Sequence, residues 1–213
     1  MNNIQLNDFP ALFSGHLPVM PVVTLNNTQM VKPLLETLLS NGISLIEVTL
    51  RTPNALRIIE TIRSTSSEIV LGAGTLTQTE QFEQVKNAGA QFSVSPGLTP
   101  ELASAAQTAQ LPFMPGIATA SEIMQAMHLG YRYLKFFPAE ISGGKQFLKA
   151  MQGPFPDINF CPTGGINLNN CKDYLNLENV FCIGATWITP QDLIEQQQWI
   201  KISDRIQEMK TNI

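Results

Sequence analysis

The feature that most constrains the fold is a regular alternation of short apolar runs with helix-like segments. Each apolar run has the length of a strand, and a segment with helical capping residues follows it. Such alternation is typical of a parallel sheet covered by helices. The eight predicted strands are 19–25, 43–50, 69–71, 92–95, 113–114, 131–140, 159–161 and 180–183.

Capping residues mark the predicted helices. Thr28 is a candidate N-cap and Pro53 suits a first helical turn, while Gly42, Gly89 and Gly130 each end a helix. The predicted helices are 7–13, 28–39, 53–63, 79–88, 99–107, 121–129, 144–151, 169–175 and 190–210.

Eight βα units predict an α/β protein that forms a closed (β/α)₈ TIM barrel with a short N-terminal helix. No break in composition marks a second domain, so the prediction is one barrel domain over residues 1–213. A doubly wound open sheet is the alternative, although it does not require eight such even units. In a barrel the carboxyl ends of the strands form the active face.

Composition excludes several classes of protein. The net charge is −4 and no basic cluster occurs, which argues against nucleic-acid binding. No apolar run is long enough to span a membrane, and residues 1–13 lack the pattern of a signal peptide. The expectation is a cytoplasmic protein without a membrane or nucleic-acid partner.

Cysteine and histidine usage gives no sign of a metal site. The three cysteines, Cys161, Cys171 and Cys182, form no CxxC pair and are predicted to be reduced core residues. His16 and His128 belong to no metal-binding motif. The sequence therefore predicts no metal and no cofactor.

Lys135 is out of place in the apolar and aromatic stretch 131–140. Lysine is almost never fully buried without a partner, and burial disfavours its charged form. A neutral amine attacks carbonyl carbons, which makes Lys135 a candidate nucleophile. The alternative is a lysine that reaches solvent from the strand end or pairs with a carboxylate such as Glu140.

Strand alternation predicts which side chains share the interior with Lys135. Glu47 and Arg51 lie on one face of the second strand with Leu45 and Thr49, whereas Ile46, Val48 and Leu50 suit packing against helices. Arg51 could hold a substrate carboxylate and Glu47 could move protons. The alternative is a structural ion pair of Glu47 with Arg51 or Lys135. The same alternation aligns Tyr133 and Phe137 with Lys135, and Cys161 with Thr163.

Glycine-rich segments follow the last two predicted strands. Thr163-Gly164-Gly165 and Gly184-Ala185-Thr186 occupy the loops in which (β/α)₈ barrels often bind phosphate through backbone N–H groups. The alternative is ordinary turn glycine. Gly143-Gly144-Lys145 is not a P-loop, because Gln146 stands where Ser or Thr is required.

Five motifs, in order along nearly the whole chain, resemble the 2-keto-3-deoxy-6-phosphogluconate (KDPG) aldolases, also called 4-hydroxy-2-oxoglutarate (KHG) aldolases. The lysine motif is the most specific of them. The motifs are Glu47-Val48-Thr49-Leu50-Arg51-Thr52, Gly72-Ala73-Gly74-Thr75, Ser95-Pro96-Gly97-Leu98, Lys135-Phe136-Phe137-Pro138-Ala139-Glu140 and Cys161-Pro162-Thr163-Gly164-Gly165-Ile166.

This resemblance implies a homotrimeric barrel and a metal-independent class I aldolase of the Entner–Doudoroff pathway. Such an enzyme cleaves KDPG to pyruvate and glyceraldehyde 3-phosphate, and also KHG to pyruvate and glyoxylate. Lys135 would form the Schiff base and Glu47 would be the acid/base. The resemblance further assigns the carboxylate to Arg51 and Thr75, the phosphate to Gly164, Gly165, Ala185 and Thr186, and other pocket positions to Thr163, Pro96 and Phe137.

One departure from the family pattern follows the eighth predicted strand. The family commonly has Gly-Gly-Ser-Trp, whereas this chain has Gly184-Ala185-Thr186-Trp187, which keeps the hydroxyl and adds two methyl groups. A related aldolase acting mainly on KHG or on the galactonate epimer of the substrate is one rival hypothesis. A second rival hypothesis, from another functional class, is a barrel that only binds a phosphometabolite or cleaves it with the help of a metal ion. The scarcity of histidines and of clustered carboxylates argues against the metal.

Overall fold

The computed structural model describes residues 8–213 and contains only parallel strand pairs. A six-stranded sheet has the order β5-β4-β3-β2-β1-β9, and a three-stranded sheet has the order β6-β7-β8. The α/β class with a parallel sheet is therefore confirmed. The strands are β1 (Val19–Val23), β2 (Leu45–Thr49), β3 (Val70–Gly74), β4 (Phe92–Val94), β5 (Phe113–Met114), β6 (Gly116–Ile117), β7 (Tyr133–Phe136), β8 (Asn159–Pro162) and β9 (Ile183–Ala185).

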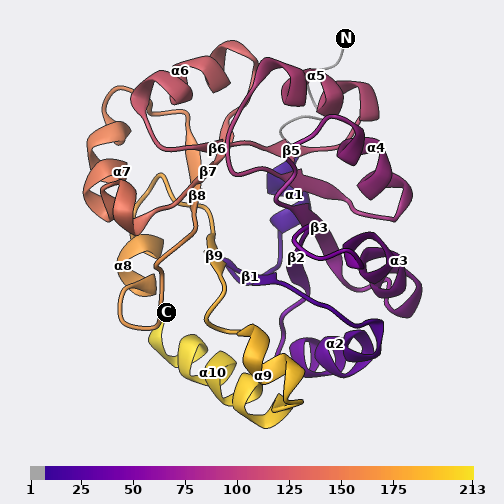
Figure 1. Cartoon of the computed structure of the whole chain (residues 1–213). Coiled ribbons are helices and arrows are strands. Elements are labelled where there is room, and N and C mark those ends of the chain that lie inside the picture. The colour runs from indigo at the N-terminus through magenta and orange to yellow at the C-terminus, as the bar shows by residue number, and fades with distance from the viewer. Residues whose placement is uncertain (1–7) are drawn as a thin grey trace.

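Helices surround the strands, which lie at the centre of the molecule (Figure 1). Thr99 and Thr119 cap α5 and α6 by accepting hydrogen bonds from backbone N–H groups of the first turn. The helices are α1 (Phe9–Phe13), α2 (Val31–Ser40), α3 (Ala55–Thr65), α4 (Glu80–Asn87), α5 (Pro100–Ala109), α6 (Ala120–His128), α7 (Gly144–Gln152), α8 (Cys171–Leu175), α9 (Gln191–Glu195) and α10 (Trp199–Asn212), with 3₁₀ turns η1 (Thr28–Met30) and η2 (Glu140–Ser142).

The two sheets approach each other at both of their ends. Isolated parallel bridges join Phe160 to Val180 and Thr163 to Gly184, which links β8 to the segment of β9. On the other side only Pro115 separates β5 from β6. Proline has no N–H group for the ladder, which explains why the single predicted strand 113–114 continues as two short strands.

Side chains on the two faces of β2 enter different parts of the core, as strand alternation predicts. Ile46 and Val48 belong to the large cluster between strands and helices. Leu45 belongs instead to a smaller inner cluster, in which it packs with aromatic and sulfur-containing side chains. The buried members of this inner cluster are Phe9, Met20, Leu45, Phe92, Val94, Met114, Cys161 and Cys182.

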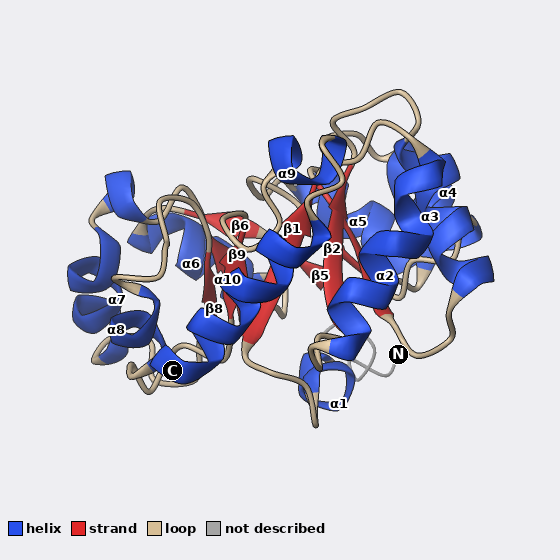
Figure 2. Cartoon of the chain, turned by 90° about the horizontal axis from the view of Figure 1, so that it is seen from below, coloured by secondary structure: helices blue, strands red, loops and turns tan. Residues whose placement is uncertain are grey.

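Helix α1 covers the amino ends of the strands. The ring centroid of Phe9 lies 5.9 Å from that of Phe92 and 5.8 Å from that of Tyr133, and these two residues begin β4 and β7. Figure 2 shows α1 at one end of the strands. The short leading helix is thus confirmed for Phe9–Phe13, whereas Asn7 of the predicted range lies outside the described residues. The carboxyl ends of the strands lie away from α1.

The last helix is held against the second by one buried side chain. The Asn41 amide oxygen accepts hydrogen bonds from Ser203 Oγ at 3.1 Å and Gln207 Nε2 at 2.6 Å. Lys210 Nζ donates to the Asn41 carbonyl at 3.2 Å. These bonds fix α10 beside the end of α2.

Several predicted boundaries are wrong. β3 continues to Gly74 instead of ending at residue 71, and β7 ends at Phe136 instead of Glu140. The terminal helix 190–210 is two helices, because Gln197 adopts a left-handed φ of 55° between α9 and α10. The last strand begins at Ile183 rather than Val180, so that Gly184 and Ala185 belong to the strand and not to the loop after it.

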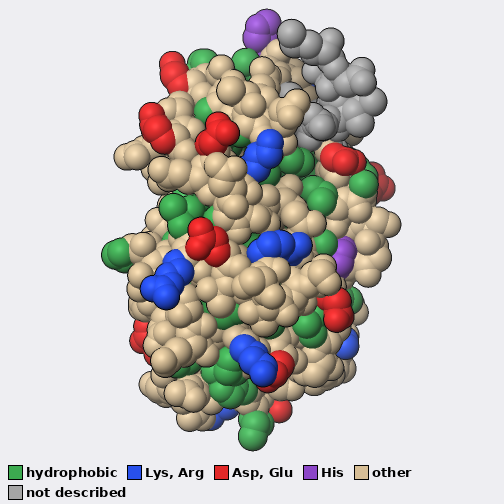
Figure 3. All heavy atoms as spheres, turned by 90° about the vertical axis from the view of Figure 1, so that its right-hand side faces the viewer, with side chains coloured by type: hydrophobic (Ala, Val, Ile, Leu, Met, Phe, Trp, Pro, Cys, Tyr) green, Lys and Arg blue, Asp and Glu red, His purple; other side chains and the backbone are tan. Residues whose placement is uncertain are grey.

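The surface has no continuous basic face in the view over α3 and α4. Figure 3 shows Lys and Arg side chains scattered there among Asp and Glu. No helix within residues 8–213 has the length and apolar character needed to cross a bilayer.

We predict that Phe9→Ala lowers the free energy of unfolding by about 3 kcal/mol, the usual cost of truncating a buried phenylalanine. The Phe9 side chain is fully buried among aromatic rings. Urea denaturation measures the change. Ile200→Ala is the control, because Ile200 is 79% exposed and its truncation should change stability by less than about 0.5 kcal/mol. Equal effects of the two changes would contradict a structural role for α1.

Candidate active site

Lys135 and Glu47 form a buried ion pair between the two sheets. Lys135 Nζ on β7 lies 3.3 Å from Glu47 Oε1 on β2. Glu47 is fully buried and Lys135 is 4% exposed. Strand alternation within the expected barrel predicted this proximity. It also placed Arg51 in the same interior, whereas Arg51 is exposed. Among the described residues Glu47 pairs with Lys135 and not with Arg51, so one of the two structural alternatives is removed.

Glu47 fits in the interior because the neighbouring strand carries a glycine. A Cβ on Gly74 would lie 1.9 Å from Glu47 Oε1, far inside contact distance. Gly74 is the last residue of β3, and its backbone pairs with that of Thr49. Gly74 was not predicted as a site residue, because a contact between strands leaves no local signal in the sequence. Gly184 provides similar room for the Thr163 hydroxyl, since a Cβ there would lie 2.2 Å from Oγ1.

The second oxygen of Glu47 is available for chemistry. Glu47 Oε2 is buried and has no hydrogen-bond partner within residues 8–213. A buried carboxylate oxygen without a partner is costly, so such an atom points to a water or a substrate group. Glu47 can therefore hold Lys135 with one oxygen and move a proton with the other.

Two of the three buried cysteines, Cys161 and Cys182, belong to the same interior. Cys161 pairs in register with Lys135 on the neighbouring strand, and Cys161 and Cys182 share the inner apolar cluster. Burial raises the pKa of the Cys182 thiol well above its usual value, and the neighbouring Cys161 and Glu47 act in the same direction. This thiol is consequently neutral and unreactive, and all three cysteines are free, as predicted.

Arg51 and Thr75 meet just beyond the carboxyl ends of β2 and β3. Arg51 Nε donates to Thr75 Oγ1 at 3.2 Å. Thr75 has a left-handed φ of 65°, which is uncommon for a β-branched residue and marks a specialised position. Arg51 is exposed and has guanidinium donors that remain available for an anion.

The predicted phosphate residues lie at the ends of β8 and β9. Gly164 and Gly165 have φ values of 99° and 81°, a conformation that favours glycine. Thr186 is exposed, whereas Ala185 is fully buried in the large core cluster. The Ala185 methyl group therefore packs in the core, and only its backbone could face a phosphate.

Three further predicted pocket residues lie near these strand ends. The ring centroid of Phe137 is 5.3 Å from Lys135 Nζ. Thr163 is buried beside Gly184, and its hydroxyl lies 4.0 Å from Cys161 Sγ. Pro96 is exposed after β4, and its carbonyl would lie 2.3 Å from a Cβ on Gly116.

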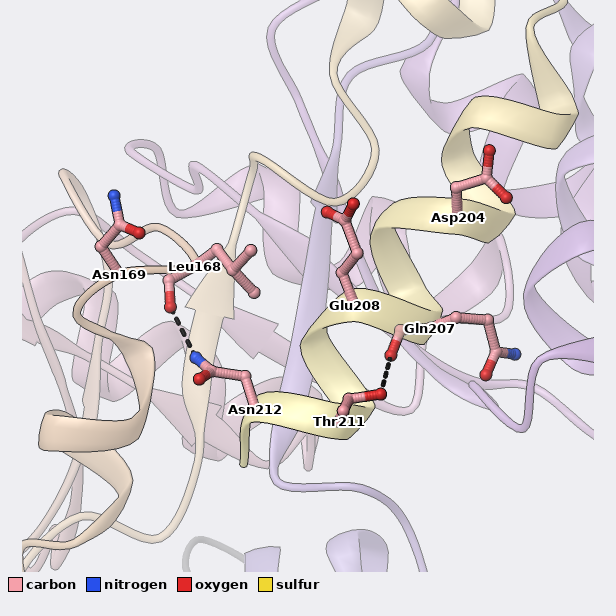
Figure 4. Close-up of a pocket in the computed structure, with 7 residues that line it drawn as sticks. All are labelled: Leu168, Asn169, Asp204, Gln207, Glu208, Thr211 and Asn212. Atoms are coloured by element: carbon pink, nitrogen blue, oxygen red, sulfur yellow. Dashed lines mark hydrogen bonds between the residues drawn. The ribbon is translucent and has the colours of Figure 1, made fainter.

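A surface cavity lies away from these residues. It has a volume of about 890 Å³ and opens between α10 and the segment 168–169 (Figure 4). None of the predicted site residues lines it. Asp204 and Glu208 contribute carboxylates there, but within residues 8–213 no group of three His, Cys, Asp or Glu side chains could hold a metal ion.

A buried lysine paired with a carboxylate, inside a parallel α/β scaffold, is an arrangement that suits enzymes in which a lysine amine acts as nucleophile. The model of the KDPG and KHG aldolase family matches residues 14–205. The chain belongs to this family.

Individual members of this family are similar to the chain over most of its length. A 2-dehydro-3-deoxy-phosphogluconate aldolase of Pseudoalteromonas atlantica is 44% identical over 88% of this chain and 87% of its own. The KHG/KDPG aldolase of Escherichia coli K12 is 43% identical, with 87% of each chain covered. The KDPG aldolase of Legionella pneumophila, solved with pyruvate captured at low pH as a covalent carbinolamine, superposes with a TM-score of 0.90. It is 42% identical and is covered over 97%, against 95% of this chain.

We predict that Gly74→Ala lowers aldolase turnover by about 10- to 100-fold, because a catalytic group displaced by about 1 Å can lose about 100-fold in rate. The added methyl group would push Glu47 Oε1 away from Lys135 Nζ. Steady-state turnover and thermal unfolding are measured together.

Gly153→Ala is the matched control. A Cβ at Gly153 would meet no atom within 4 Å, and its φ of −64° suits alanine. Turnover of this variant should equal that of the unchanged protein. Normal turnover of Gly74→Ala would show that Glu47 does not need its observed position.

Proposed function

We propose that this protein is a class I aldolase that cleaves KDPG to pyruvate and glyceraldehyde 3-phosphate, and also KHG to pyruvate and glyoxylate. The observation that carries the proposal is the buried contact between Lys135 Nζ and Glu47 Oε1. The names of the relatives support the two substrates. The pyruvate carbinolamine in the Legionella enzyme supports a covalent route.

The first half of the reaction joins the substrate to the enzyme. Lys135 gives a proton to Glu47, and the resulting free amine attacks the C2 keto carbon, whose oxygen takes that proton from Glu47 to give a carbinolamine. Glu47 accepts the proton released by nitrogen and returns it to the departing hydroxyl. Loss of water leaves a protonated Schiff base on Lys135.

The second half breaks the carbon–carbon bond. Glu47 removes the proton of the C4 hydroxyl, and the electrons of the C3–C4 bond move into the iminium. Glyceraldehyde 3-phosphate, or glyoxylate from KHG, leaves. The enamine is then protonated at C3, and water hydrolyses the iminium to release pyruvate and free Lys135. The iminium is the electron sink, so we propose that the reaction needs no metal and no cofactor.

Arg51 and Thr75 are proposed to bind the carboxylate of the 2-oxo acid. Their hydrogen bond orients the guanidinium at the strand ends, and a guanidinium fits a carboxylate in a bidentate contact. Thr163, Pro96 and Phe137 are proposed to line the pocket around the reacting carbons. Phe137 lies over the Lys135 ammonium and limits its access to water.

The phosphate is proposed to bind to backbone groups of Gly164, Gly165 and Ala185 and to the hydroxyl of Thr186. The positive φ of both glycines and the exposure of Thr186 support this assignment. Backbone N–H groups at such a loop bind phosphate well.

We also propose that residues 1–213 form one closed (β/α)₈ barrel that assembles as a cytoplasmic homotrimer. The bridges between β8 and the segment of β9, and the short step across Pro115, support closure. The trimer and the location rest on the family alone. Light scattering on the purified protein measures the number of subunits.

Borohydride reduction in the presence of pyruvate should add one three-carbon group, and peptide mapping should place it on Lys135. Lys135→Ala should abolish both the adduct and turnover, because no other amine replaces the nucleophile. Lys145→Ala is the control and should keep both. An adduct on Lys145 or Lys149 would overturn the assignment.

Thr186→Ala should lower kcat/KM for KDPG by about tenfold to more than a hundredfold. Losing one hydrogen bond to a charged group costs about 1.5–3 kcal/mol. Cleavage of KHG, which has no phosphate, should be nearly unchanged. Steady-state kinetics on both substrates provide the comparison, and an equal loss on both would make Thr186 a structural residue.

A further inference from the structure

Glu140, the last residue of the lysine motif, lies between the start of α7, helix α8 and the glycine loop 164–165. Its carboxylate accepts a hydrogen bond from the hydroxyl of Tyr174 on α8. Its aliphatic stem lies against the loop, since a Cβ on Gly165 would be 2.6 Å from both Cβ and Cγ of Glu140. A Cβ on Gly144, at the start of α7, would be 3.3 Å from Glu140 Oε1.

Backbone hydrogen bonds hold the same loop from both sides. Ala139 N donates to Thr163 O at 2.8 Å, and Glu140 N donates to Gly164 O at 3.1 Å. The carbonyl of Gly165 accepts from the Asn167 and Asn170 side chains at 3.3 and 3.2 Å. The backbone carbonyls of Thr163, Gly164 and Gly165 therefore all accept hydrogen bonds from protein groups.

Tyr174 is suited to anchor this arrangement. Its side chain is fully buried, although its hydroxyl reaches an otherwise exposed carboxylate. Burial, followed by the Glu140 carboxylate, raises the pKa of Tyr174 above its usual value, so the phenol stays a proton donor. The hydrogen bond from Tyr174 therefore holds the Glu140 stem against Gly165.

Glu140 is not suited to contact the phosphate itself, because a carboxylate repels that anion. Its effect on the loop must come through its stem and its bond to Tyr174. Glycine loses more conformational freedom than any other residue when it is ordered. A loop with two adjacent glycines thus gains the most from external contacts that fix it before the ligand arrives.

We propose that Glu140 and Tyr174 are positioning residues that preorganise the loop 164–165 for phosphate, and so set the preference for phosphorylated over unphosphorylated 2-oxo acids. This inference rests on the proposed function, in which the loop binds the substrate phosphate. Neither side chain takes part in the chemistry at Lys135.

The test compares two substrates across paired variants. Tyr174→Phe removes only the hydroxyl and should lower kcat/KM for KDPG about threefold to tenfold, the range of one net hydrogen bond. The loss should appear as a higher KM for KDPG, with kcat nearly unchanged. Values for KHG should stay within about twofold of the unchanged protein, since its cleavage does not use the loop.

Two substitutions of Glu140 provide a second comparison. They should not disturb the core, because the Glu140 side chain is exposed. Glu140→Ala removes the stem and the acceptor and should lower the ratio of KDPG to KHG activity at least as much as Tyr174→Phe. Glu140→Gln keeps the stem and an acceptor oxygen and should restore most of that ratio.

Lys145→Ala is the matched control at the same junction. Lys145 on α7 forms an ion pair with Asp173 on α8, one residue before Tyr174, but does not contact the loop. Its removal should leave the substrate ratio unchanged. Equal losses on both substrates in Tyr174→Phe, or a ratio unaffected by Glu140→Ala, would overturn the inference. Failure of the proposed function would appear earlier, as an unchanged protein that forms no pyruvate adduct or does not cleave KDPG.

Discussion

The structure is arranged around one costly interaction, the buried ion pair of Lys135 and Glu47. Removing two charges from water costs several kcal/mol per ion, and their attraction offsets this only in part. The surrounding apolar core supplies the remainder. A pair of this kind is weak evidence for stability, and under the proposed function it is retained because it supplies a reactive amine.

Strand periodicity predicted much of this arrangement. Alternation along β2 correctly separated Glu47 from Ile46 and Val48, and the same rule placed Lys135 inside. The contact itself joins residues 88 positions apart, so no local pattern could give its distance. The break at Gln197 was also missed, because a left-handed conformation outside glycine has no reliable sequence signal.

Two glycines in the strands make room for polar side chains in the interior. Gly74 and Gly184 lack the atom that would collide with Glu47 and Thr163. A glycine in a strand is usually a weakness, but here it allows a polar group to lie flat against the neighbouring backbone. Tyr174 was not predicted to contact the site, for a related reason. In the sequence it is one aromatic residue in a short helix, and only the folded chain brings Glu140 to its hydroxyl.

The hydrogen bonds between Asn41 and α10 affect the order in which the protein can fold during synthesis. Asn41 is synthesised well before its partners Ser203, Gln207 and Lys210, which follow it by 162 to 169 residues. Synthesis adds about 5–20 residues per second, so α2 must wait several seconds with this flank open. The docking of α10 against α2 therefore has to wait until the residues between them, which include most of the strands, have been made.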